Sequence, residues 1–353
     1  MNRFYSVWLL TLAMLLAVAG CTSSVRVQVN GTKLNGSSTE LEVVERFDYE
    51  RLPINANLAP LTELSGNGYS VSEITFPSIG ENGQSGDLVT AHYYKNAESS
   101  AKPLIIILPI WGSYKYPSTK IGKGIRRRGK SQVHVIMMQG EAPIFDWEAM
   151  HEDVPPEKFE YTLWRMGERI RVTSMDVRRI LDWAETRSEI DQNRISLVGF
   201  SMGAIVSSLA IMHDRRFHST VLVMGGADLG KIVATCHGRL ELLRETAMTR
   251  YGWTIDQMRE VASRAFGHIN QIDFPGRVDP RSILFIDATK DKCMPQSSRD
   301  ALWNALGQPE RISYNYGHHG AFLAMTPLGF NVMRRQIYRF LEKSLGYGKA
   351  AKR

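Results

Sequence analysis

The chain has 353 residues, of which 43% are hydrophobic and 22% charged, and its formal net charge is +7. This is the composition of an ordinary globular protein, and the length suits one large α/β domain or two smaller ones. A core of this size buries most of its apolar surface without a disulfide or a metal, so the small stapled scaffolds are excluded.

The positive charge is spread along the chain, and its densest cluster combines Arg126, Arg127 and Arg128 with Lys123 and Lys130. An anionic surface or a nucleic acid is one possible partner for such a cluster. No aromatic or glycine residues interleave with it, so the pattern favours the solvated end of a helix. We therefore expect no nucleic-acid partner.

The first twenty residues have the pattern of a secretory signal peptide. Arg3 supplies the positive start, and the apolar run over residues 7–19 is too short to cross a bilayer core of roughly 30 Å as a helix. The small residues directly before Cys21 resemble the bacterial lipobox, which implies lipidation of Cys21 as the mature N-terminus. An ordinary secretory signal with a chance cysteine is the alternative. Because Thr22 follows in place of Asp, the resemblance implies an anchor on the periplasmic face of the outer membrane.

Polar residues dominate positions 21–68, which predicts a tether followed by irregular structure. Apolar and polar residues then alternate over residues 70–76 and 87–94, which predicts an antiparallel hairpin. Short runs rich in β-branched residues predict further strands, buried on both faces. These runs cover residues 103–109, 133–138, 195–200, 220–224, 282–286 and, more weakly, 311–316.

Helical patterns lie between the predicted strands, over residues 119–128, 161–187, 203–213, 296–306 and 328–345. Strands that alternate with helices predict parallel βαβ units and a mostly parallel, doubly wound α/β sheet. The predicted domain covers residues 69–346 and is followed by a basic tail at 347–353. Residues 231–277 interrupt the alternation because they are helical and polar, so we expect an insertion there, with a lid as its possible role.

The strongest chemical signal is the sequence GFSMG at residues 199–203, a G-x-S-x-G pattern. It lies directly after a predicted strand and directly before a predicted helix, as a nucleophile elbow requires. Such a turn leaves no room for Cβ atoms at Gly199 and Gly203, and it holds the serine near the amides of the helix N-terminus. A glycine-lined turn with a capping serine is the alternative. We predict Ser201 as a nucleophile.

A serine hydroxyl needs a histidine to take its proton and a carboxylate to orient that histidine. In chains with a nucleophile elbow of this type, the acid and then the histidine follow the serine. Asp291 lies just past the end of a predicted strand and is the predicted acid, with Asp228, after the preceding strand, as the alternative. Asp287 lies inside the same strand or at its edge, and we expect a structural role for it.

The base is predicted in the sequence GHHGAF at residues 317–322, which follows the last predicted strand. Two adjacent histidines cannot both face one serine, and the position directly after Gly317 favours His318 over His319. The oxyanion of an acyl-transfer reaction needs two N–H donors. We expect one from Met202 and the other from the loop after the first buried parallel strand, where Trp111 is the candidate.

From residue 86 to residue 345 the chain resembles the α/β-hydrolases, in particular dienelactone-hydrolase-like and acetyl-xylan-esterase-like enzymes. The elbow GFSMG, the acid loop DATKDKCMP and the histidine loop GHHGAF carry the resemblance. It implies a serine hydrolase that cleaves a small or carbohydrate-linked carboxylic ester through an acyl-enzyme on Ser201, without a cofactor. A serine peptidase or amidase, and an envelope lipoprotein that uses the scaffold only for binding, are the alternatives.

Metal and dinucleotide sites have little support in the sequence. It has no H-E-x-x-H or paired-cysteine motif, and Gly122 and Gly124 neither follow a predicted strand nor extend to G-x-G-x-x-G.

Apart from Cys21, the cysteines are Cys236 and Cys293. They form either a disulfide, as an oxidising compartment permits, or two buried thiols, and their spacing does not decide between these.

Overall fold

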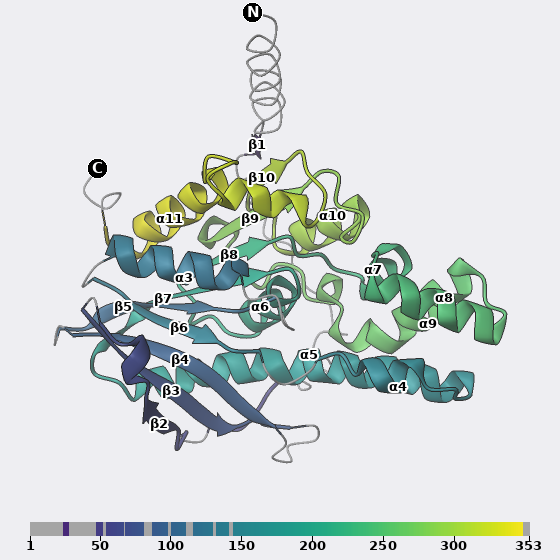
Figure 1. Ribbon diagram of the computed structural model, residues 1–353, viewed down its shortest axis with the longest axis horizontal. Helices are drawn as coiled ribbons and strands as arrows, with labels where there is room; N and C mark the ends of the chain where they lie inside the picture. The colour runs from purple at the N-terminus through teal and green to yellow at the C-terminus, as the bar shows by residue number, and fades with distance from the viewer. Residues whose placement is uncertain are drawn as a thin grey trace, which may run out of the picture.

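The computed structural model describes residues 24–27, 47–51, 54–66, 68–80, 87–97, 100–110, 116–129, 132–140 and 144–348. Within these residues one ten-stranded sheet forms the centre of the molecule, with helices on both of its faces (Figure 1). In order across the sheet, the strands are β1 (Ser24–Val27), β10 (Glu310–Tyr314), β9 (Ile283–Ala288), β8 (Ser219–Val223), β7 (Ile190–Phe200), β5 (Lys102–Ile107), β6 (His134–Met138), β4 (Leu88–Asn96), β3 (Tyr69–Pro77) and β2 (Asn57–Pro60).

The six strands from β10 to β6 run parallel to one another, and the strands at both edges of the sheet pair antiparallel. The β-branched runs form the parallel centre because helices cover both of its faces. Ile105, Ile106 and Ile107 of β5, for example, are all fully buried. The predicted fold class, a mostly parallel sheet with an antiparallel hairpin before it, is confirmed.

Two layers of helices cover the sheet. On one face, α3 (Tyr116–Gly129) and α11 (Val332–Leu345) bury their apolar residues in one core cluster. On the other face, α5 (Pro156–Glu185), α6 (Met202–Met212) and α10 (Gln296–Ala305) contribute to a second cluster. The short 3₁₀ helices are η1 (Thr62–Leu64), η3 (Gly267–Ile269), η4 (Gln271–Asp273), η5 (Pro280–Ser282) and η6 (Gly320–Met325).

Helices fill the segment between β8 and β9, where the sequence predicts a helical insertion. They are α7 (Leu229–Thr235), α8 (Arg239–Tyr251) and α9 (Ile255–Phe266), and they project beyond the sheet beside α4 (Trp147–His151) and the first half of α5 (Figure 1). Tyr251 donates a hydrogen bond to the Val154 carbonyl at 2.7 Å, and Arg264 pairs with Glu160 at 2.9 Å. These contacts hold the insertion against the region around the start of α5.

Several elements differ from the sequence-based expectation. The strands β1 and β2 lie in the segment predicted as tether and irregular structure, and α4 was not predicted. The helix predicted from residue 161 begins instead at Pro156, because proline fits the first turn of a helix. The helix predicted from residue 328 begins only at Val332, since Phe330 and Asn331 have positive φ angles of 54° and 51°.

The predicted signal peptide and Cys21 lie outside the described residues, as does the tail from residue 349. Over the part of the chain that is described, no helix combines the length and the hydrophobicity needed to cross a bilayer.

Candidate active site

Ser201 occupies a sharp turn between the end of β7 and the start of α6. Its φ of 52° and ψ of −113° are a conformation that residues other than glycine rarely adopt, so the surrounding structure must hold it in place. The Ser201 N–H donates to the Val223 carbonyl of β8 at 2.8 Å, and the Ser201 carbonyl accepts from the Ala204 N–H at 2.9 Å. The strand β8 and the helix α6 therefore both hold the turn in place.

The two glycines of the GFSMG motif allow the close approach that this turn requires. A Cβ atom at Gly199 would overlap with the Gly203 carbonyl oxygen, and a Cβ atom at Gly203 would overlap with the Pro109 carbonyl oxygen. Both obstacles are backbone atoms, which cannot move away as a flexible side chain can. The turn thus packs directly against the chain that leaves β5.

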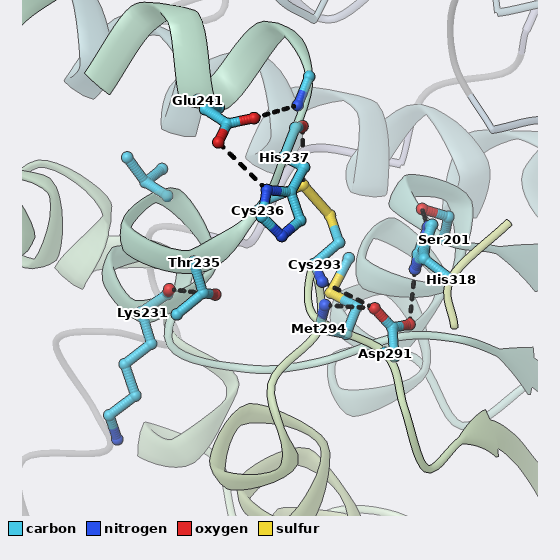
Figure 2. The surroundings of a disulfide bond; sticks show 12 residues. Ser201, Lys231, Thr235, Cys236, His237, Glu241, Asp291, Cys293, Met294 and His318 are labelled. Carbon is cyan, nitrogen blue, oxygen red and sulfur yellow. Dashed lines mark hydrogen bonds and ion pairs between the residues drawn. A yellow bond between two sulfur atoms is a disulfide. The ribbon is translucent and has the colours of Figure 1, made fainter. Parts of the chain in front are cut away.

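A continuous line of hydrogen bonds leads away from Ser201. Its Oγ lies 3.0 Å from Nε2 of His318, and Nδ1 of His318 lies 2.6 Å from Oδ2 of Asp291. The other carboxylate oxygen, Oδ1, accepts the backbone N–H groups of Cys293 and Met294, each at 2.8 Å (Figure 2). In this arrangement Nδ1 carries the proton shared with the carboxylate, and Nε2 is free to accept the serine proton.

The site lies at the carboxyl ends of the parallel strands. Ser201 follows β7, Asp291 follows β9 and His318 follows β10, so three strand ends bring together residues that are far apart in the sequence. The Asp291 side chain is fully buried and the His318 side chain is only 10% exposed. Hydrogen bonds between such groups are stronger than in water because the surroundings have a low dielectric constant.

The alternative acid has a different role. Asp228 precedes α7, where its side chain accepts the Lys231 N–H at 3.3 Å and pairs with the Lys231 ammonium at 3.0 Å. It therefore caps a helix of the insertion. Asp287, for which we expect a structural role, lies within β9 and forms ion pairs with Arg299 and Arg311.

The adjacent histidine lies beside the site. The His319 ring packs edge-on against the His318 ring, with centroids 5.3 Å apart and planes at 89°. Burial, together with the neighbouring His318, lowers the pKa of His319 below its ordinary value. The structure thus brings His318, and not its neighbour, between the serine and the acid.

The two predicted oxyanion donors differ in what the structure shows. Met202 is the first residue of α6, so its N–H has no acceptor within the helix and lies directly beside Ser201 in the chain. Trp111 lies outside the described residues, which reach Ile110 on this loop. Its role therefore stays a prediction.

Sequence reasoning missed one feature of the site and left another open. The N–H groups of Cys293 and Met294, which hold the Asp291 carboxylate, were not predicted. The open question concerned the cysteines, and the structure answers it, because Cys236 and Cys293 form a disulfide. The only signal in the sequence was that two cysteines are left once Cys21 is set aside. Among the described residues, no group of three or more His, Cys, Asp or Glu side chains is placed to hold a metal ion.

Comparisons of the sequence with protein families and with curated proteins give distant relatives. No family model matches the chain. Two uncharacterised proteins of Mycobacterium tuberculosis, from strains CDC 1551 / Oshkosh and ATCC 25618 / H37Rv, are each 27% identical to it over 172 residues. The match covers 48% of this chain but only 37% of each relative, so the chain spans little more than a third of the length of these proteins.

Solved structures resemble the chain over most of its length. An acetyl xylan esterase from Paenibacillus sp. R4 superposes with a TM-score of 0.62 at 17% identity, covering 87% of this chain and 96% of the esterase. Acetyl xylan esterase 1 from Thermoanaerobacterium sp. JW/SL YS485 gives a TM-score of 0.59 at 15% identity, with coverages of 85% and 96%. The chain has the α/β-hydrolase fold. A Pyrococcus horikoshii acylaminoacyl peptidase matches with a TM-score of 0.52 at 14% identity, and only 42% of that chain is covered.

At these identities the likeness is one of fold, and the chemistry must be argued from the residues themselves. In the α/β-hydrolase fold a serine occupies the turn between strand and helix, and the acid and the histidine follow it in the chain. Ser201, Asp291 and His318 hold these positions, and they are joined by hydrogen bonds. Such an arrangement can activate a serine hydroxyl for attack on a carbonyl carbon.

Proposed function

We propose that this protein is a serine hydrolase that cleaves a carboxylic ester, small or carbohydrate-linked, through an acyl-enzyme on Ser201. The observation that carries the proposal is the unbroken line of hydrogen bonds from Ser201 Oγ through His318 to the buried carboxylate of Asp291. A protein that used this scaffold only for binding would not need all three groups in this order.

The first half of the reaction forms the acyl-enzyme. Ser201 Oγ attacks the ester carbonyl while His318 Nε2 accepts the hydroxyl proton, and Asp291 stabilises the positive charge that the imidazole gains. Negative charge develops on the carbonyl oxygen, and the Met202 N–H, together with the proposed donor Trp111, stabilises it. His318 then gives its proton to the leaving alcohol.

The second half repeats these steps with water as the nucleophile. Water gives a proton to His318 Nε2 and attacks the acyl group on Ser201, and the tetrahedral intermediate collapses to release the acid. His318 returns the proton to Ser201 Oγ. These steps need no group beyond the side chains and amides named above.

Two comparisons support an ester as the substrate. The structures with TM-scores of 0.62 and 0.59 are acetyl xylan esterases, and 96% of each is covered by the match. The acylaminoacyl peptidase is covered over only 42% of its length. We therefore place an acetylated or similarly small acyl ester first, and an amide second.

Turnover of esters and amides by the full-length protein tests this proposal. We expect hydrolysis of p-nitrophenyl acetate and of acetylated xylo-oligosaccharides, and much slower release of p-nitroaniline from an aminoacyl anilide. Ser201→Ala is the matched control and should abolish turnover without changing the circular dichroism spectrum. Faster cleavage of the anilide would favour the peptidase reading, and a folded wild type without any turnover would favour a binding role.

We also propose that a lipid on Cys21 anchors the chain at the cell envelope, on the periplasmic face of the outer membrane. The support is the signal-peptide pattern that ends at Cys21 and the residue after it, which is Thr22 in place of Asp. Metabolic labelling with an alkyne fatty acid, followed by membrane fractionation, tests the anchor. Cys21→Ser should lose both the label and the membrane association, and labelling that persists in this variant would contradict the proposal.

A further inference from the structure

The disulfide Cys236–Cys293 joins the insertion to the loop that carries the proposed acid. Cys236 is the C-cap residue of α7, and Cys293 lies between β9 and α10, 57 positions further along the chain. Figure 2 shows Cys293, which is bonded to Cys236, next to Asp291, whose carboxylate accepts the Cys293 N–H. The disulfide is therefore close to the site. Among the described hydrogen bonds, none joins Cys236 or Cys293 to His318 or Ser201.

The loop between β9 and α10 has two parts that are held in different ways. The first part is fixed to the sheet, because the N–H groups of Thr289 and Lys290 donate to the carbonyls of Tyr314 and Tyr316 at 2.8 and 2.9 Å. In the second part, the N–H groups of Cys293 and Met294 both donate to Asp291 Oδ1. Because those two N–H groups hold the Asp291 carboxylate, any contact or bond that fixes residues 293 and 294 also fixes the orientation of this carboxylate.

The insertion end of the disulfide is firmly held. Arg244 of α8 is buried, and its guanidinium donates to the carbonyls of Val233 and Cys236 at 2.8 and 3.0 Å. Ile232 and Val233 belong to the core cluster that α5 and α9 also share. The last turn of α7 is thus part of the packed body of the protein, and the disulfide ties the acid loop to it.

We propose that the Cys236–Cys293 disulfide is a positioning element of the site, which holds the Cys293 and Met294 N–H groups where they direct the Asp291 carboxylate at His318. This inference rests on the proposed hydrolase function. Without the covalent tie, the second part of the loop gains freedom, and Asp291 Oδ2 spends less time at the 2.6 Å contact with His318 Nδ1. Turnover then depends on the oxidised state of the two cysteines.

Reduction by dithiothreitol breaks the bond between the two sulfur atoms. The dithiol supplies two electrons and two protons, Cys236 and Cys293 become free thiols, and the reagent closes into its cyclic disulfide. The reaction changes no other described covalent bond, so it isolates the contribution of the tie.

The expected effect falls on kcat, because the acid stabilises a charge that His318 carries only during the reaction. Misplacement of a supporting group by about 1 Å can cost up to about 10²-fold in rate, so we expect a loss of between about tenfold and 10²-fold in kcat. KM should change by less than about threefold. The acid limb of kcat/KM should move to lower pH, because a poorly held carboxylate stabilises the protonated imidazole less.

The test compares the full-length protein before and after reduction, with p-nitrophenyl acetate as substrate. Alkylation and mass spectrometry confirm that Cys236 and Cys293 are both free in the reduced sample, and circular dichroism confirms the fold. The double variant Cys236→Ala/Cys293→Ala should reproduce the reduced behaviour and should not respond to dithiothreitol. Arg264→Ala, which loosens the insertion at its contact with Glu160 instead, is the matched control and should leave the acid limb in place.

Each outcome decides the matter. Unchanged kcat and an unchanged acid limb after complete reduction would overturn the proposal. Loss of the folded state in both the reduced protein and the double variant would overturn it too, because the pair would then be a staple of the fold. An oxidised protein without any turnover would instead refute the hydrolase function on which this inference rests.

Discussion

Replacement of Asp291 by Asn tests the proposed line of hydrogen bonds at its most buried member. The amide has nearly the same shape as the carboxylate, and its oxygen can accept the Cys293 and Met294 N–H groups in place of Oδ1. The amide nitrogen then faces His318 Nδ1. Because that nitrogen can only donate, Nδ1 must become an acceptor and the proton moves to Nε2, where it faces Ser201.

The cost follows from this change of tautomer. With a proton on Nε2, His318 cannot accept the proton of Ser201, although the contact distances are preserved. The same exchange in other Ser-His-Asp sites lowers kcat by about 10⁴-fold. This corresponds to roughly 5 kcal/mol of lost transition-state stabilisation. We expect a loss of this order in Asp291→Asn, with KM nearly unchanged because the substrate itself does not touch the acid.

The assay is the initial rate of p-nitrophenyl acetate hydrolysis between pH 6 and 9, with thermal unfolding to confirm the fold. Asp228→Asn is the matched control, because Asp228 is the other candidate acid and caps α7. It should keep kcat within about twofold. A kcat for Asp291→Asn within tenfold of the wild type, or a large loss in Asp228→Asn, would refute the reasoning.

Three further changes test other parts of the account. His318→Ala should lower kcat on p-nitrophenyl acetate by about 10³-fold or more, while His319→Ala keeps most of it; equal losses would contradict the choice of base. Gly203→Ala should lower the free energy of unfolding in urea by about 3 kcal/mol, because the new Cβ overlaps with the Pro109 carbonyl oxygen; an unchanged urea midpoint would show that the turn has room. Burial lowers the pKa of His213 to about 4 in the folded protein. As the pH falls, His213 therefore takes up a proton in the unfolded chain before it does so in the folded one. The contribution of the neutral His213 to the free energy of unfolding is thus present at neutral pH and is lost between about pH 6.5 and 4. In urea unfolding, the difference between the free energies of unfolding at pH 7 and pH 4 should be smaller in His213→Gln than in the wild type by about 3 kcal/mol. An equal difference in both proteins would contradict the assignment.

The sequence predicts the centre of the fold because its signals there are local. Runs such as residues 103–109 contain enough β-branched residues to indicate buried strands, and the helices between them follow from apolar spacing. The edge of the sheet is different. The strands β1 and β2 are four residues each in a polar segment, and they exist because β10 and β3 offer partners from elsewhere in the chain.

The same contrast holds at the site. The order serine, acid, histidine and the positions after strand ends indicate Ser201, Asp291 and His318 as the candidates, and the structure joins these three by hydrogen bonds. The disulfide could not be selected in this way, because it depends on where the insertion packs against the acid loop. The backbone groups that hold the carboxylate were equally invisible, since any residue type supplies an N–H.

The most direct test of the central claim is to locate the residue that a fluorophosphonate modifies. The probe reacts with a serine whose hydroxyl is activated by a general base, so mass spectrometry of the labelled protein should find a single adduct on Ser201. Labelling should be much slower in His318→Ala at the same pH. A folded wild-type protein that carries no adduct, or that carries it on a different residue, would contradict the account.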